Sequence, residues 1–289
     1  MTKISSDIKA VLSPKAKSLG DGITVKRALP FAGLRSVGPW VFFDHFGPVD
    51  FSPGQGMNVR PHPHINLATV TYLFEGEIFH RDSLGNALVI RPGAVNLMVA
   101  GNGIVHSERT SAELKATGYS LHGLQLWHAL PESKEEIDAE FHHYPASEIP
   151  EFSVDGVKIR LIMGKAFGYE SPVKTFCQTL YMEATLKVGQ SLTLPDIPEM
   201  AVYSLNAGLM IDDQPIDENQ FAVVNSQARV SSNSACKIAV IGGESLGHRF
   251  MEWNFISSRK DRIEQAKSDW IAGKFPIVPG DEEEFIPYP

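Results

Sequence analysis

The sequence contains little cysteine: only Cys177 and Cys236 occur among its 289 residues. They form no Cys-x-x-Cys motif, which excludes a disulfide framework and favours a reducing compartment. We expect two separate core thiols, with one bridge between them as the alternative. Closed structural zinc sites favour cysteine ligands, so that class of site is not expected either.

Long apolar runs are also missing. No stretch of the sequence approaches the roughly 18 consecutive apolar residues that a transmembrane helix needs. The first 19 residues contain four lysines and no apolar core, so we expect no signal peptide. A cytoplasmic protein without membrane contact is therefore predicted.

Clustered positive charge is a third absence. Lysine and arginine number 26 against 34 aspartates and glutamates, which gives a net charge of −8. The densest basic cluster comprises Arg259, Lys260 and Arg262, is interrupted by Asp261, and is expected to be the solvated face of a helix. Without a basic patch, direct nucleic-acid binding is not expected, and the acidity suits a protein partner better.

What the sequence does contain is a series of short strands separated by turns. Between residues 69 and 108, runs of β-forming residues alternate with turns rich in Asp, Asn, Gly and Pro, about every ten residues. Such spacing is typical of a sandwich or a small barrel. In this half we expect strands at 69–74, 77–81, 87–90, 95–100 and 104–108. In the second half we expect strands at 179–188, 201–205, 221–224 and 237–241.

The length predicts two domains, and the polar, proline-punctuated stretch at 131–148 is the expected boundary. We predict an N-terminal metal-binding barrel over 1–135, a second barrel over 146–255, and a C-terminal helix and tail over 256–289. Ser258 is the expected helix N-cap, and Gly273 ends the helix. The acidic run at 280–284 is expected to be a solvated tail.

Two short motifs contain the side chains that bind metals. His62 and His64 flank Pro63, and His106 stands two residues before Glu108. Residues two apart on a β-strand point to the same face, so two adjacent strands would bring three imidazoles and one carboxylate together. Pro63 is tolerated at a strand edge or bulge. The alternative is that Pro63 breaks the strand and both histidines only flank a loop.

Three histidines and one glutamate suit a divalent first-row metal, and Fe(II) above all. Mn(II), Ni(II), Co(II), Cu(II) and Zn(II) are also compatible with these ligands. On an octahedral ion, four protein ligands leave two positions for a substrate and O₂. Nine of the ten histidines precede residue 145, so the second barrel is expected to lack metal chemistry.

Other polar residues near these motifs receive a structural interpretation. Asp44 and His45 are adjacent and would face opposite ways on a strand. We expect Glu75 to be an exposed turn residue and His80 to be a surface histidine.

A series of segments is similar to known proteins. The two most specific are Arg-Pro-His-Pro-His at 60–64 and Ala-Gly-Asn-Gly-Ile-Val-His-Ser-Glu at 100–108. Further similar segments are found at 40–48, 69–72, 80–85, 91–93 and 125–127. Together they resemble the pirin family of bicupin proteins, densely over residues 20–130 and more thinly over 146–255.

The resemblance implies an all-β fold of two cupin-type β-barrels in tandem. It implies one metal ion, usually iron, in the N-terminal barrel, and a second barrel without metal. Carried over position by position, the ligands are His62, His64, His106 and Glu108.

Two functions attach to the family. Some members resemble quercetin 2,3-dioxygenase, which cleaves the flavonol heterocycle with O₂ and releases carbon monoxide; others are regulators that bind a transcription factor or a metabolic enzyme. We expect a metal-dependent dioxygenase that binds a small aromatic substrate such as quercetin and O₂, with Glu108 accepting a substrate proton. The regulator with a protein partner is the alternative, and a sugar-binding or isomerase cupin is a third interpretation.

Overall fold

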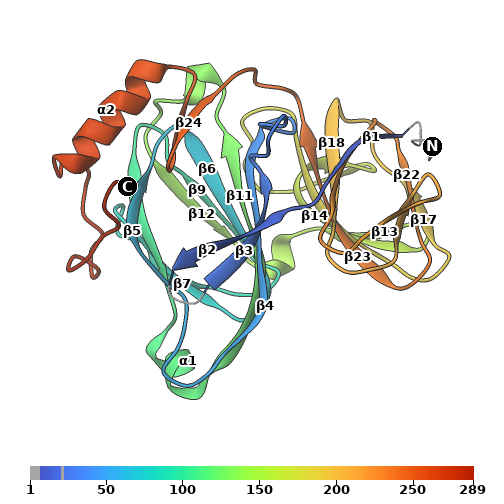
Figure 1. Ribbon diagram of the computed structural model, residues 1–289, viewed down its shortest axis with the longest axis horizontal. Coiled ribbons are helices and arrows are strands. Elements are labelled where there is room, and N and C mark those ends of the chain that lie inside the picture. Colours follow the sequence, from blue (N-terminus) through green and yellow to red (C-terminus); the bar gives the residue numbers. More distant parts are fainter. Residues whose placement is uncertain (1–6, 21–22) are drawn as a thin grey trace. The chain divides into compact units, whose positions relative to one another are not determined.

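The computed structural model describes residues 7–20 and 23–289 and contains two compact units, which are interleaved along the sequence. The unit we call the first barrel contains 17–20, 23–25, 43–146 and 246–289, and the unit we call the second barrel contains the segment ending at Ala16, 26–42 and 147–245. Both units consist mainly of antiparallel strands (Figure 1). The expected boundaries at 1–135, 146–255 and 256–289 are sequential, whereas these compact units exchange segments.

Two sheets form the first barrel. Its seven-stranded sheet has the order β12-β9-β6-β11-β4-β3-β2, and its four-stranded sheet has the order β5-β10-β7-β8. The strands of the larger sheet are β2 (Lys15–Gly20), β3 (Ile23–Leu29), β4 (Trp40–Phe51), β6 (Leu67–Glu75), β9 (Val95–Val99), β11 (Tyr119–Ala129) and β12 (Glu140–Tyr144). Those of the smaller sheet are β5 (Asn58–His64), β7 (Ile78–Asp82), β8 (Ala87–Ile90) and β10 (Ile104–Arg109). Two short helical segments connect strands of this barrel, α1 (Ala112–Thr117) and η1 (Glu132–Lys134), and a third, η2 (Ala146–Glu148), follows β12.

The second barrel repeats this plan. Its larger sheet has the order β1-β21-β18-β23-β16-β14-β13, with β15 paired to β14, and its smaller sheet has the order β17-β22-β19-β20. The larger sheet contains β1 (Ile8–Leu12), β13 (Glu151–Val154), β14 (Val157–Ala166), β15 (Tyr169–Glu170), β16 (Thr179–Leu186), β18 (Glu199–Ser204), β21 (Phe221–Val224) and β23 (Cys236–Gly243). The smaller sheet contains β17 (Ser191–Thr193), β19 (Leu209–Ile211), β20 (Gln214–Ile216) and β22 (Arg229–Ser232).

Strand alternation gives each barrel its core. On β16, Leu180, Met182, Ala184 and Leu186 are all buried in one apolar cluster with residues of β14, β18, β21 and β23. Period-two alternation turns one face of a strand inward, so the second barrel is filled by aliphatic side chains. The all-β bicupin fold is therefore confirmed.

The C-terminal part of the first barrel consists of the hairpin β24 (Phe250–Glu252) and β25 (Phe255–Ser257) and the helix α2 (Lys260–Ile271). Ile263 and Ala266 of α2 are buried with Ile65 and Phe255 and form the apolar face of the helix. The expected N-cap at Ser258 is wrong. Helix α2 begins at Lys260 with Arg259 at the cap position and no side-chain cap, because the Ser258 hydroxyl donates to Glu135 instead.

Two expectations about exposed charge in this region are wrong for one residue each, whereas Arg259, Lys260 and the glutamates at 282–284 are exposed as expected. Arg262 is buried and its guanidinium pairs with Glu136 at 3.0 Å. The acidic tail is not simply solvated, because Asp281 pairs with Arg109 through Nε–Oδ2 at 2.6 Å. In both cases an oppositely charged side chain, distant in sequence, offsets the cost of removing the charge from water.

The two cysteines are free, as expected. Among the described residues, no helix combines the length and the apolar character that a bilayer span requires.

Candidate metal centre

The histidine motifs lie on neighbouring antiparallel strands. In the pairing of β5 with β10, His106 is opposite His62 and Ile104 is opposite His64. The register shifts between His106 and Glu108, as at a β-bulge. β5 is an edge strand, where the missing N–H of Pro63 costs little. The strand interpretation of the His-Pro-His motif is thus confirmed.

The three imidazoles converge inside the first barrel. His62, His64 and His106 are all buried, and each offers a ligand nitrogen within 4.8 Å of the others. The Nε2 atoms of His64 and His106 are 3.1 Å apart. Two nitrogens bound at right angles, each about 2.1 Å from one ion, would lie about 3 Å apart. The spacing of these side chains fits a metal ion.

Backbone carbonyls fix the orientation of two of these rings. The Nδ1 atom of His62 is 2.9 Å from the carbonyl oxygen of Arg60, and Nδ1 of His64 is 3.2 Å from that of Asn254. A carbonyl can only accept, so Nδ1 carries the proton and the Nε2 lone pair is available as a ligand. Among the described residues, Nδ1 of His106 has no hydrogen-bond partner.

Burial also keeps the rings uncharged. It lowers the pKa of His62 from 6.5 to about 4, opposed by the hydrogen bond to Arg60. Burial, together with the neighbouring histidines, holds the pKa values of His64 and His106 well below the usual value. Neutral imidazole is the metal-binding form.

Glu108 is buried on the same strand as His106, but it is not part of the group formed by the three histidines. Burial raises its pKa from 4.5 to about 7, and a hydrogen bond from Thr71 opposes the shift. No residue in the described part of the chain forms a hydrogen bond with its Oε1. A buried carboxyl oxygen without a partner is costly, and a cation beside it would remove that cost. The role of Glu108 as the fourth ligand remains a prediction.

The expectation for His80 is wrong. His80 is buried, its Nε2 lies 3.1 Å from Asp82 Oδ2, and its ring is 5.4 Å from that of His106. It stacks on Phe141 at 4.6 Å. Its strand, β7, pairs with β10 and places His80 opposite Glu108, which explains the burial. Glu75 is exposed, as expected.

Several residues around the centre were not predicted from the sequence. Trp127 stands edge-on to His64 with ring centroids 5.0 Å apart, and the Thr71 hydroxyl donates to Gln125 Oε1 at 2.9 Å. Period-two alternation along β6 and β11 toward the histidines is the signal that points to these side chains. No sequence signal identifies Asn254, because its backbone carbonyl rather than its side chain makes the contact.

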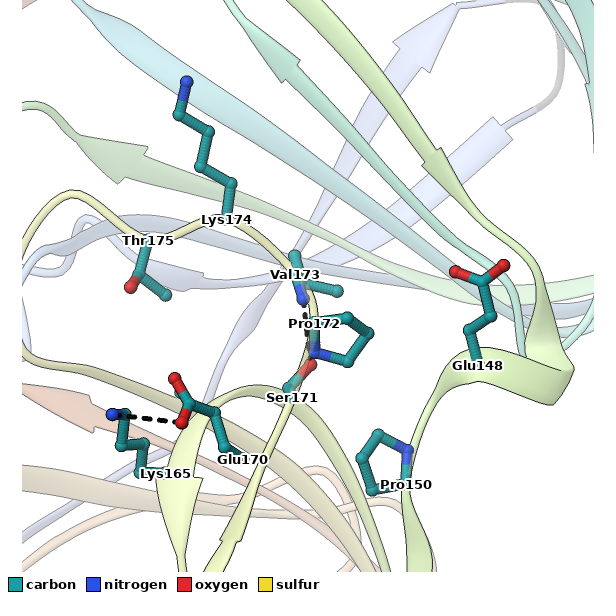
Figure 2. A pocket seen from close by; sticks show the side chains of 10 residues that line it. Glu148, Pro150, Lys165, Glu170, Ser171, Pro172, Val173, Lys174 and Thr175 are labelled. Atoms are coloured by element: carbon teal, nitrogen blue, oxygen red, sulfur yellow. Dashed lines mark hydrogen bonds and ion pairs between the residues drawn. The ribbon is translucent and has the colours of Figure 1, made fainter.

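The second barrel contains a pocket of about 580 Å³ with a different character (Figure 2). None of its lining residues is a predicted metal ligand. Charges of both signs line it, and Lys165 pairs with Glu170 at 3.1 Å. This lining favours no particular ligand charge.

Comparison with known proteins identifies the family of this chain. The family model "Pirin" matches residues 22–128, and the model "Pirin C-terminal cupin domain" matches residues 181–276. A pirin-like protein of Caulobacter vibrioides is 46% identical over 288 residues, covering 98% of this chain and 99% of that one. This chain belongs to the pirin family.

Solved structures show the same relationship. A crystal structure described as quercetin 2,3-dioxygenase from Acinetobacter baumannii matches this pirin with a TM-score of 0.89 and 30% identity, covering 97% of this chain and 94% of that one. A bacterial pirin from Escherichia coli, solved in complex with nickel(II), matches with a TM-score of 0.62. At 18% identity, covering 82% of this chain and 100% of that one, this second match shows the fold alone.

Proposed function

We propose that this pirin is a metal-dependent dioxygenase that acts on a flavonol such as quercetin, with Fe(II) bound by His62, His64, His106 and Glu108. The observation that carries the proposal is the convergence of three uncharged, buried imidazoles within 4.8 Å. The A. baumannii relative described as a quercetin 2,3-dioxygenase supports this choice of reaction.

The histidines and Trp127 would each perform one task, and the bound ion would perform another. The histidines present their Nε2 lone pairs, because the carbonyls of Arg60 and Asn254 hold the Nδ1 protons of two of them. The buried ring of Trp127 beside His64 offers an apolar surface to a flat aromatic substrate. A bound divalent ion would supply Lewis acidity toward a substrate hydroxyl and a place for O₂.

Glu108 would accept the proton of that hydroxyl. Burial raises the pKa of Glu108 above its usual value, so its ionised carboxylate would be a stronger base than an exposed one. A carboxylate that loosens from the ion would be free to take the proton.

The test is elemental analysis of the purified protein together with quercetin-dependent O₂ uptake. We expect metal-loaded protein to consume O₂, metal-stripped protein to be inactive, and Glu108→Gln to lower kcat by roughly 10²–10⁴-fold. Glu140→Gln is the matched control, because Glu140 pairs with His142 on β12. Undiminished quercetin turnover by the stripped protein would contradict the proposal.

A rate on quercetin equal to that of the free metal ion would also contradict it. That result would favour the regulatory alternative. Specific partners captured by the metal-loaded protein but not by the stripped protein would then establish a regulator.

A further inference from the structure

The C-terminal segment, residues 246–289, contacts a predicted metal ligand. The turn between β24 and β25 consists of Trp253 and Asn254, and the Asn254 carbonyl lies 3.2 Å from Nδ1 of His64. Beside it, Phe255 forms a parallel bridge with Ile65. His62, by contrast, is held by Arg60 of its own strand. The two ligands of the His-Pro-His motif therefore depend on different parts of the chain.

A buried carboxylate anchors this hairpin. Glu135 Oε1 accepts from the Ser258 backbone N–H at 2.8 Å and pairs with Arg249 Nε at 3.0 Å. Its Oε2 accepts from the hydroxyls of Ser257 at 3.1 Å and Ser258 at 2.9 Å. Glu135 thus joins both ends of the hairpin segment, since Arg249 precedes β24 and Ser258 follows β25.

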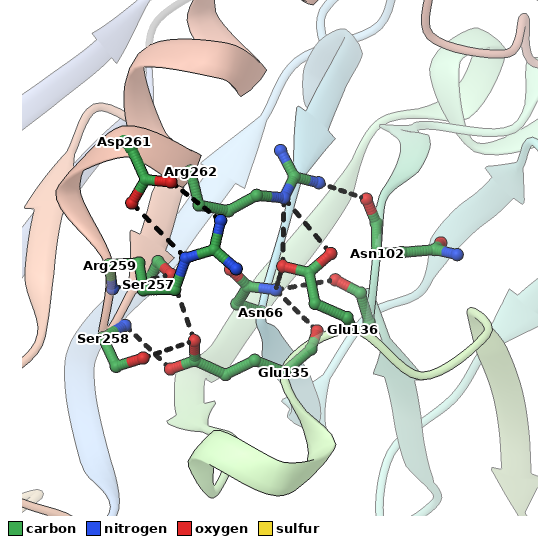
Figure 3. A network of polar contacts seen from close by, with 10 residues as sticks. Asn66, Asn102, Glu135, Glu136, Ser257, Ser258, Arg259, Asp261 and Arg262 are labelled. Carbon is green, nitrogen blue, oxygen red and sulfur yellow. Dashed lines mark hydrogen bonds and ion pairs between the residues drawn. The ribbon is translucent and has the colours of Figure 1, made fainter.

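Glu135 and its neighbour Glu136 also bind Asn66 (Figure 3). Asn66, two residues beyond His64, donates through Nδ2 to the Glu135 carbonyl at 2.5 Å and to Glu136 Oε1 at 3.0 Å. Glu136 in turn pairs with Arg262 of α2 at 3.0 Å. Glu135 and Glu136 therefore fix both the chain next to His64 and the hairpin that touches its ring.

We propose that Glu135 is a positioning residue of the metal centre: it anchors the β24–β25 hairpin so that the Asn254 carbonyl holds the Nδ1 proton of His64. Fixing this proton sets the tautomer and the direction of Nε2. The inference rests on the metal-binding part of the proposed function and does not depend on the substrate.

Two variants and two matched controls test it. Glu135→Gln removes the buried charge, and Ser258→Ala removes one anchoring hydroxyl while leaving Glu135 in place. Asp269→Asn removes an exposed pair with Lys274 in the same segment, and Ser268→Ala removes a hydroxyl that donates to Glu264. The hydrogen bonds that these two control variants remove do not involve Glu135 or His64.

The first readout is nitrogen-15 NMR of the histidine rings in metal-free protein, with His62 as the internal reference. We expect Glu135→Gln to accelerate exchange of the His64 Nδ1 proton at least about tenfold and to leave His62 unchanged, since local opening governs exchange. The second readout is Co(II) affinity by chelator competition, which should fall about 10–100-fold. Ser258→Ala should give smaller changes in the same direction, and the controls none.

Unchanged exchange at His64 in folded Glu135→Gln protein overturns the inference, as does equal acceleration at His62 and His64, which would indicate general loosening. If Glu135→Gln fails to fold, Ser258→Ala decides on the same criteria. If wild-type protein binds no Co(II), the proposed metal centre is wrong, while ring exchange still tests the anchoring.

Discussion

The two barrels have smaller sheets with the same strand order and different side chains on them. In the first barrel the strand next to the edge is β10, where His106 pairs with His62 on one side and Asp82 on the other. In the second barrel the strand in the same position is β22. There Val230 pairs with Leu192 and Ile211.

The difference concerns chemistry and not architecture. Val230, Leu192 and Ile211 are all buried in the aliphatic cluster of the second barrel. The corresponding residues of the first barrel are the imidazoles of His106 and His62 and the carboxylate of Asp82, and these are also buried. A cupin barrel is stable when its interior is apolar. Buried polar groups in the first barrel cost free energy unless they are bonded. Asp82 accepts hydrogen bonds from Asn86 and the Leu84 backbone N–H, and a metal ion would provide bonds for the two imidazoles.

Replacing His106 with valine, the residue at the corresponding position of the second barrel, should have the largest effect on metal affinity. We expect His106→Val to reduce metal affinity beyond the roughly 10–100-fold that follows loss of a group supporting a ligand, because a ligand itself is removed. Elemental analysis and chelator competition measure this. His143→Val is the control, since His143 is exposed and bonded to Asn96. Full metal occupancy in the His106→Val variant would show that the three histidines do not bind one ion together.

A cavity in the aliphatic core of the second barrel should lower the stability of the protein without changing its metal affinity. Leu192 is 1% exposed, so Leu192→Ala should lower the free energy of unfolding by about 2–5 kcal/mol. Urea unfolding measures this loss. Metal affinity at pH 7 should stay at the wild-type value, and a parallel fall would mean that the barrels do not separate these tasks.

The sequence was sufficient for the strands between residues 69 and 108 and for the convergence of the three histidines, because period-two alternation and His-x-His spacing are local signals. The bicupin fold was implied by the family resemblance and not by the spacing. It was insufficient where burial depends on distant partners. His80 is buried because β7 pairs with β10, and Asp281 is bonded because Arg109 lies near it in space. Ser258 does not cap α2, because the buried Glu135 accepts its hydroxyl. These contacts cannot be predicted from the residues that neighbour them in the sequence.

The pH dependence of metal affinity should identify the carboxylate. Burial raises the pKa of Glu108 to about 7 and lowers that of His62 to about 4. An ion that binds ionised Glu108 displaces its proton below pH 7, so affinity should fall about tenfold per pH unit between pH 7 and pH 4, and more steeply below. Chelator competition at several pH values measures the slope. An equal slope in Glu108→Gln would exclude Glu108 as a ligand.

The smallest effect is expected at His80. His80→Ala removes a ring beside His106, but Asp82 keeps hydrogen bonds from Asn86 and from the Leu84 backbone N–H. Metal occupancy should therefore equal that of wild type, whereas Glu108→Ala should lower it. Elemental analysis of both variants makes the comparison. Loss of metal in His80→Ala would enlarge the ligand set beyond the four predicted residues.

The most direct measurement is the metal content of protein purified without added metal, compared between wild type and the His106→Val variant. Wild type should contain one transition-metal ion per chain, and His106→Val should contain almost none. A wild-type protein that contains no metal and does not take up Fe(II), Mn(II), Co(II) or Ni(II) would contradict the central claim that the first barrel is built around an ion.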